Sequence, residues 1–215
     1  MHLVDVEFEK NVLDANRKLA EENAKILKEH GIKSYDFMGA IGSGKTALIY
    51  QITKNLLNNG LKVAAITGDV AGDEDAVRLR ELSIPVVNIT TGKDCHLDAH
   101  RVMHALEKLP LDEIDVLFVE NVGNLVCPAD FPLGTDKRVV VVSVTEGDDM
   151  VVKHPYIFMV ADIAVLNKID LAEYLDISLD RIREDYRKVK PNSDIIFTSA
   201  RTGEGIEELM KALGF

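Results

Sequence analysis

The chain has 215 residues, 47% of them apolar, and a formal net charge of −11 at pH 7, which fits a single ordinary domain with a buried core. The negative charge argues against a nucleic-acid-binding protein, because neutralising a phosphate backbone requires clustered Lys and Arg. No apolar run reaches the roughly 18 residues of a membrane span and the first residues lack an export pattern, so we expect a cytoplasmic protein whose partners are proteins and small molecules.

A helix is predicted over residues 7–30, because apolar residues recur near helical spacing and Gly31 stands where a C-terminal cap belongs. Apolar runs of strand length then alternate with amphipathic stretches. Strands are predicted at 34–38, 62–67, 85–89, 116–119, 138–144, 163–166 and 194–197. Helices are predicted between them, at 45–59, 73–82, 96–108, 178–189 and 204–213. This alternation predicts an α/β fold with a mostly parallel sheet and helices on both faces, in a domain of residues 32–215 that follows an N-terminal helical extension of residues 1–31.

Residues 39–46 form a phosphate-binding loop by their pattern, G-x-x-x-x-G-K-[ST], and they stand between a predicted strand and a predicted helix. Glycines let the backbone wrap a polyphosphate with its N–H groups inward, and the helix N-terminus adds positive potential. Lys45 would reach the outer phosphates and Thr46 would ligate Mg²⁺. The predicted contacts of the nucleotide phosphates are Gly39, Ala40, Ile41, Gly42, Ser43, Gly44, Lys45, Thr46 and Ala47.

The base end of the nucleotide site is predicted from Asn167-Lys168-Ile169-Asp170, which follows a predicted strand and therefore lies at the carboxyl edge of the sheet. An aspartate there accepts two hydrogen bonds from guanine N1 and N2, whereas adenine offers no such donor pair. The Ala200 N–H, after the last strand, is expected to contact guanine O6. The predicted base contacts are Asn167, Lys168, Asp170, Ser199, Ala200 and Arg201.

A transition-metal site is suggested by Cys95 and three nearby histidines, His96, His100 and His104. The i, i+4, i+8 spacing predicts that the histidines lie along one face of a helix. Thiolate and imidazole ligands suit Ni²⁺ or Zn²⁺, and a second thiolate, Cys127, is expected at the same edge of the sheet. The alternative is a solvated helix face beside a buried cysteine, and it remains open above all for His100 and His104.

Taken together, these segments resemble the HypB family of hydrogenase-maturation GTPases, which are related to the urease accessory GTPase. The resemblance spans residues 36–215, and its most specific parts are Gly92-Lys93-Asp94-Cys95-His96-Leu97-Asp98-Ala99 and Glu120-Asn121-Val122-Gly123-Asn124-Leu125-Val126-Cys127-Pro128. It implies a P-loop NTPase that binds GTP or GDP with Mg²⁺ and assists nickel insertion into [NiFe]-hydrogenase. It also implies a homodimer that depends on GTP and metal, with a nickel chaperone and the hydrogenase large-subunit precursor as partners.

The resemblance also implies roles for particular residues. The segment 120–123 takes the place of the usual Asp-x-x-Gly, with Glu120 near Mg²⁺ and the Gly123 N–H sensing the γ-phosphate. Asp69 is expected as a second carboxylate near Mg²⁺ and Asp75 as a further candidate, although either acid also suits a helix cap or a loop. The catalytic set is then Lys45, Thr46, Asp69, Glu120 and Gly123. The implied nickel or zinc ligands are Cys95, His96 and Cys127, with His100 as an additional candidate.

Some features depart from the family or leave other functions open. Residue 124 is Asn rather than a water-orienting Gln, so slow hydrolysis is expected. No Cys-x-x-Cys-Gly-Cys segment or histidine-rich tract precedes the domain, which argues against nickel storage. A urease-maturation GTPase is disfavoured because Cys127-Pro128 is followed by Ala129, not His. Asn167 to Asp170 argues against a small-metabolite kinase, and Lys45 with Thr46 argues against a scaffold without turnover.

Overall fold

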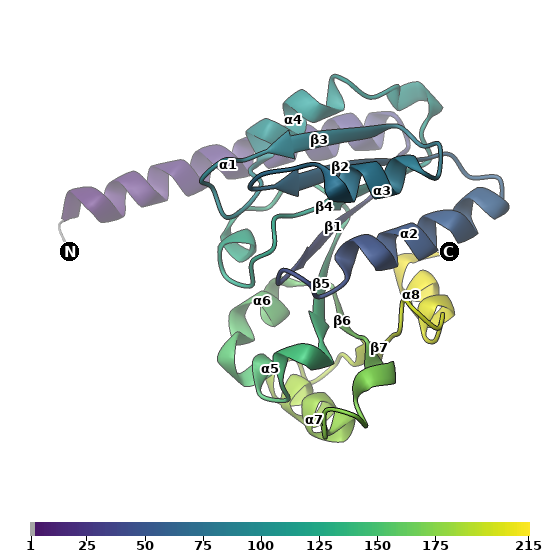
Figure 1. Cartoon of the computed structure of the whole chain (residues 1–215). Coiled ribbons are helices and arrows are strands. Elements are labelled where there is room, and N and C mark those ends of the chain that lie inside the picture. The colour runs from purple at the N-terminus through teal and green to yellow at the C-terminus, as the bar shows by residue number, and fades with distance from the viewer. Residues whose placement is uncertain (1–2) are drawn as a thin grey trace.

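A computed structural model of the chain describes residues 3–215 and shows one seven-stranded sheet with helices on both faces (Figure 1). The strand order is β3-β2-β4-β1-β5-β6-β7, and every pair is parallel. The strands are β1 (Lys33–Gly39), β2 (Val63–Asp69), β3 (Val86–Thr90), β4 (Val116–Glu120), β5 (Lys137–Ser143), β6 (Ile163–Asn167) and β7 (Ile195–Phe197). Each predicted strand overlaps one of these, so the predicted α/β fold is confirmed.

Eight α-helices accompany the sheet in residues 3–215. They are α1 (Leu3–Glu29), α2 (Lys45–Asn58), α3 (Glu74–Arg80), α4 (Ala99–Leu106), α5 (Met150–Lys153), α6 (Pro155–Val160), α7 (Leu179–Val189) and α8 (Ile206–Leu213). Short 3-10 helices occupy Leu111–Glu113, Cys127–Asp130, Val144–Glu146 and Ile169–Leu171. None of the helices in the described part of the chain has both the length and the apolar character needed to cross a membrane.

The core follows from the alternation of side chains along buried strands. Phe37 faces the layer of α2, α3 and α8, whereas its neighbour Met38 faces the layer of α5, α6 and α7. In β4, Leu117 likewise packs toward α1 and α4 while Phe118 packs toward α2. Because both faces are covered, the strands are apolar nearly throughout, and the polar residues that follow their carboxyl ends gather at one edge.

The helix predicted at 96–108 begins later in the structure. The Asp98 side chain accepts a hydrogen bond from the Arg101 N–H at 2.8 Å, which makes Asp98 the N-cap, and α4 starts at Ala99. Cys95 and His96 therefore lie in the loop before the helix, and the predicted stripe of three histidines along one helix face is wrong. Helices α5 and α6 were not predicted, because segments this short carry little periodicity.

Helix α1 is tied to the rest of the fold by two asparagines. Asn16 Oδ1 accepts the Ala99 N–H at 2.8 Å, and Asn23 Nδ2 donates to the Ala99 carbonyl at 2.8 Å and to the Leu133 carbonyl at 3.0 Å. Leu27 is buried in the same layer as α4. The N-terminal part of α1 projects beyond the domain (Figure 1). Residues 1–2 of the predicted extension lie outside the described part of the chain.

Candidate functional site

The phosphate-binding loop leaves the fully buried end of β1 and enters α2. Gly39, Gly42 and Gly44 all have positive φ angles, of 148°, 77° and 96°. A Cβ atom at Gly39 would lie 2.0 Å from the Val141 carbonyl oxygen, and one at Gly44 would lie 2.3 Å from Asn167 Nδ2. The loop can take this close course only with glycine at these two positions.

Two carboxylates converge on the hydroxyl of Thr46. Thr46 Oγ1 lies 2.7 Å from Asp75 Oδ1 and 2.8 Å from Glu120 Oε1. Glu120 is only 3% exposed, its Oε2 has no hydrogen-bond partner among the described residues, and burial raises the pKa of Glu120 to about 7 although Lys45 opposes the shift. A hydroxyl and two carboxylates with a buried, unpaired oxygen are hard ligands that fit Mg²⁺.

Asp75, rather than Asp69, is the second carboxylate in contact with this site. Asp69 ends β2, and its carbonyl accepts the Thr91 N–H at 2.8 Å. Its charge still favours the protonated form of Lys45 and opposes ionisation of Glu120. Asp69 is therefore placed to influence the site electrostatically, without a hydrogen bond to Thr46.

Lys45 lies inside the loop that precedes it. Its Nζ donates to the carbonyl oxygens of Gly39 at 3.2 Å and Ala40 at 3.1 Å. Burial lowers the pKa of Lys45, while Glu120 and Asp75 act in the opposite direction. The cation is thus held between the phosphate-binding loop and the two carboxylates.

The segment after β4 packs directly on the phosphate-binding loop. A Cβ atom at Gly123 would lie 2.3 Å from Ile41 Cγ1 and 2.9 Å from the Ile41 backbone nitrogen. The Asn124 N–H donates to the Gly39 carbonyl at 3.0 Å, which forms an isolated antiparallel bridge. A group bound in the loop would therefore meet the backbone around Gly123.

The base-side motifs line a pocket of 450 Å³ beside the start of α2. The residues that line this pocket include Gly44, Lys168, Asp170 and Arg201. Asp170 Oδ1 accepts a hydrogen bond from Ser199 Oγ at 2.6 Å, which fixes the orientation of the carboxylate. The second oxygen, Oδ2, makes no hydrogen bond to the part of the chain that the structure describes and can accept from a ligand. The predicted guanine-binding residues from two separate segments are thus brought together at one pocket.

Asn167 joins the two ends of the nucleotide site. Its Nδ2 donates to the Ser43 carbonyl at 3.0 Å, and its Oδ1 accepts from the Ala200 N–H at 3.1 Å and from Thr198 Oγ1 at 3.2 Å. The side chain is nearly fully buried. The Ala200 N–H, which was expected to contact guanine O6, is already bonded to Asn167, so a contact with O6 would have to share this donor.

A compact group of metal ligands is formed by Cys95, His96 and Cys127, whose ligand atoms all lie within 4.8 Å of one another. The two Sγ atoms are 2.7 Å apart, and Cys95 Sγ is 3.8 Å from His96 Nδ1. The His96 ring packs on Phe131 with a centroid distance of 3.9 Å, and burial lowers the pKa of His96. A neutral imidazole with two thiolates suits Ni²⁺ or Zn²⁺.

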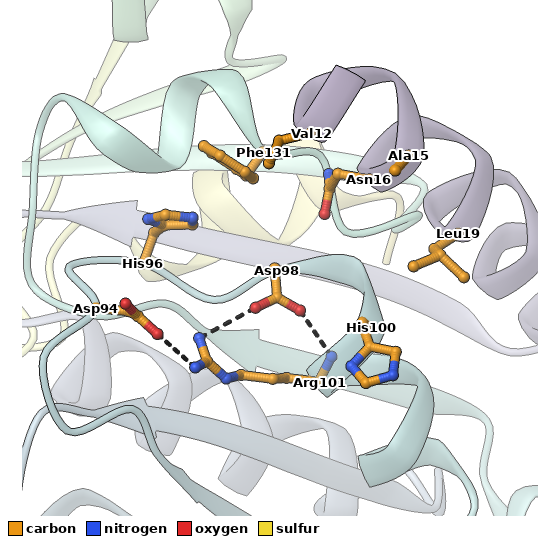
Figure 2. A pocket seen from close by; sticks show the side chains of 10 residues that line it. All are labelled: Val12, Ala15, Asn16, Leu19, Asp94, His96, Asp98, His100, Arg101 and Phe131. Carbon is orange, nitrogen blue, oxygen red and sulfur yellow. Dashed lines mark hydrogen bonds and ion pairs between the residues drawn. The ribbon is translucent and has the colours of Figure 1, made fainter. Parts of the chain in front are cut away.

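His100 and His104 lie on α4 and are not part of this three-residue group. Their Nε2 atoms are 3.2 Å apart, and His104 Nδ1 also lies 3.1 Å from Glu107. Figure 2 shows His96 on the loop before the helix and His100 on the helix, both lining a pocket of 390 Å³ beside α1. Ion pairs from Arg101 to the carboxylates of the preceding turn brace this loop.

A buried polar network, not foreseen from the sequence, lies behind the metal ligands. Asp36 is completely buried on β1, accepts from Asn121 Nδ2 at 3.1 Å and lies 3.7 Å from Arg138 Nε. Burial raises the pKa of Asp36 to about 6, and Arg138 acts against the shift. The Arg138 guanidinium also donates to the carbonyls of Pro128 and Ala129, next to Cys127. The sequence signal for this network is the charged residue Asp36 within the apolar strand β1.

Comparison with known proteins gives consistent matches. The CobW/HypB/UreG family, nucleotide-binding domain, matches residues 35–197. The probable hydrogenase maturation factor HypB of Methanocaldococcus jannaschii is 50% identical over 212 residues, covering 98% of this chain and 96% of the relative. A crystal structure of hydrogenase maturation factor HypB from Archaeoglobus fulgidus is 46% identical, with a TM-score of 0.86 over 93% of this chain and 97% of that one. A crystal structure of HypB from Helicobacter pylori in complex with nickel is 34% identical, with a TM-score of 0.87 over 93% of each chain.

Proposed function

The chain belongs to the HypB hydrogenase maturation factors of the CobW/HypB/UreG family, and from this premise we propose that it is a cytoplasmic GTPase that assists nickel insertion into [NiFe]-hydrogenase. In this proposal it hydrolyses GTP slowly to GDP and phosphate and uses the change of nucleotide to control a metal site. Residues 32–215 act as the GTPase domain, with α1 as its N-terminal extension.

The phosphate end of the site supports GTP hydrolysis. Lys45 would bind the outer phosphates, and Thr46 would hold Mg²⁺ with help from Glu120 and Asp75. A metal ion held there would neutralise the negative charge that develops on the phosphates. The Gly123 N–H would meet the γ-phosphate because its segment packs on Ile41. No glutamine follows this glycine to orient the attacking water, which supports slow turnover.

The base end supports a preference for guanine. Ser199 orients Asp170, whose carboxylate would accept the guanine N1 and N2 donors, and the stem of Lys168 would lie along the base plane. Adenine presents no matching pair of donors, so its binding would leave the Asp170 carboxylate without these partners.

The metal group supports the handling of nickel, with zinc as the alternative ion. Each chain supplies Cys95, His96 and Cys127, so a fourth ligand must come from water or from a second chain. A homodimer in which the same patch meets itself would supply it, whereas His100 lies outside the three-residue group. We propose that the nickel chaperone of hydrogenase maturation loads this site and that the hydrogenase large-subunit precursor is the destination.

One observation carries the proposal: Glu120 of the Mg²⁺ site is the last residue of β4, and only residues 121–126 separate it from Cys127 of the metal group. Sedimentation tests it, using the wild type and Cys127→Ala with GDP or a non-hydrolysable GTP analogue, each with and without Ni²⁺. We expect the wild type to dimerise with the GTP analogue and metal, and the variant to respond more weakly. If the sedimentation mass of both proteins is the same with either nucleotide and with or without Ni²⁺, the proposal is contradicted.

A further inference from the structure

Asn124 forms hydrogen bonds both to the phosphate-binding loop and to the backbone of a metal ligand. Its backbone N–H donates to the Gly39 carbonyl at 3.0 Å. Its side-chain Oδ1 accepts the N–H of Val126 at 2.7 Å and the N–H of Cys127 at 3.1 Å. The side chain therefore sets the backbone course from the loop to the thiol of Cys127.

Asn121 makes the corresponding connection to the other two ligands. Its Oδ1 accepts the Val122 N–H and the Leu97 N–H, both at 3.0 Å. Leu97 directly follows His96 and is fully buried, and a Cβ atom at Gly68 would lie 2.6 Å from its side chain. Asn121, just before Val122 and Gly123, thus holds the backbone next to His96, and the Leu97 side chain packs closely on β2 at Gly68.

We propose that Asn121 and Asn124 are positioning residues that transmit the state of the nucleotide to the two halves of the metal group. They flank Val122 and Gly123, so a γ-phosphate contact that shifts this backbone also shifts both side-chain acceptors. One acceptor moves with the loop of Cys95 and His96, and the other moves with Cys127. This rests on the proposed function and adds the residues through which the coupling passes.

The competing explanation is that Asn124 only closes a local turn, as Asn often does by bonding to its own backbone two residues on. A turn of that kind would stabilise the segment equally in every nucleotide state. A transmitting residue, in contrast, changes the ratio of metal affinities between two states, and coupling between sites is commonly on the order of 5- to 150-fold.

The experiment uses the full chain with Asn124→Ala, which removes the acceptor, and Asn124→Ser, which keeps a neutral acceptor able to form the same type of turn. Asn124 is half-buried, so both variants should fold. The matched control is Asn55→Ala, which removes an exposed side-chain amide on α2 whose hydrogen bond within residues 3–215 goes to Gln51 of its own helix.

Two readouts are measured with GDP and with a non-hydrolysable GTP analogue: Ni²⁺ affinity, by competition with a chromogenic chelator, and amide hydrogen exchange over residues 121–131 without metal. In the wild type and in Asn55→Ala, both readouts should depend on the nucleotide. Asn124→Ala should bring the ratio of nickel affinities close to one and make exchange at Val126 and Cys127 fast in both states. Asn124→Ser should retain most of the wild-type behaviour.

The outcomes separate the two proposals. The inference would be overturned if Asn124→Ala kept the wild-type ratio of nickel affinities between the two nucleotide states and the wild-type amide exchange. If nickel affinity of the wild type ignores the nucleotide, the proposed coupling of GTP to metal fails. In that case the positioning role stands if exchange still responds to the nucleotide in the wild type but not in Asn124→Ala, and it is overturned if exchange responds in neither.

Discussion

Cys95 and Cys127 are 32 positions apart in the chain, yet their Sγ atoms lie 2.7 Å from each other. The contact joins the loop before α4 to the turn after β4. Both cysteines are free, and the hydrogen bond from Cys95, with some burial, raises the pKa of the Cys127 thiol to about 11. A bound metal ion takes the thiolate form, so loading this pair must release protons.

Removing one thiol should therefore abolish tight metal binding. Cys127→Ser is expected to weaken Ni²⁺ and Zn²⁺ affinity by more than the roughly 10- to 100-fold typical of losing a residue that only supports a ligand. His100→Gln should leave the affinity unchanged, because His100 lies outside the three-residue group. Competition against a chromogenic chelator at fixed pH measures both. A large loss in His100→Gln would place that histidine in the metal shell.

Asp170→Asn should change the preferred base. The substitution turns one acceptor into a donor that faces the guanine donors, while the hydrogen bond from Ser199 can persist. We expect GTP binding to weaken by about 2 to 4 kcal/mol and binding of a xanthine nucleotide to improve. Fluorescence titration with guanine, xanthine and adenine nucleotides tests this. Equal affinity of the unmodified protein for GTP and ATP would contradict the assignment of this pocket.

Lys45→Ala should separate turnover from stability. Among the described residues, the hydrogen bonds of Lys45 Nζ go to carbonyls of its own loop, at Gly39 and Ala40, so the core does not depend on it. GTP hydrolysis should fall at least about 100-fold, the scale of losing one donor to a developing negative charge. The free energy of unfolding should change by less than about 1 kcal/mol. If the variant unfolds globally, the lysine serves the fold rather than the phosphates.

The buried carboxyl of Asp36 predicts a pH dependence of stability. Burial raises the pKa of Asp36 from its ordinary 3.8 to about 6. Between these values the folded chain holds a proton that the unfolded chain has released, so the free energy of unfolding falls as pH rises through this window. The contribution is on the order of 2 to 3 kcal/mol.

Asp36→Asn should lack this fall, because an amide does not titrate. Urea unfolding of both proteins at pH 4.5 and pH 7 measures the effect, and the variant should gain relative to the wild type at the higher pH. A constant difference between the two proteins at both values would mean that Asp36 titrates as an exposed aspartate does.

Much of the architecture and the family resemblance could be predicted because the signals are local. The alternating strands and the loop around Lys45 need only neighbouring residues to be recognised, and the family resemblance is confirmed by the comparisons. The histidine periodicity predicts a helix from residue 96, whereas the Asp98 cap starts α4 at Ala99. The spacing of His96 and His100 is helical, but a helix cannot begin before its cap.

The rest depended on contacts between distant segments. Nothing near Asp75 distinguishes it from Asp69, and the choice between them is made by how α3 brings Asp75 to Thr46. The roles of Asn121 and Arg138 are equally hidden, since their partners come from other strands and loops. Such contacts depend on how the whole sheet packs, and no local sequence pattern predicts them.

The anchoring of α1 has a practical consequence. Asn16 and Asn23 hold both the N–H and the carbonyl of Ala99, immediately after the cap of α4 and three positions from His96. A shortened protein that begins near residue 32 would keep every proposed ligand and every nucleotide motif. It would nevertheless lose the hydrogen bonds that fix the loop beside His96. Weak nickel binding by such a fragment would therefore result from the loss of these hydrogen bonds and not from the loss of a ligand.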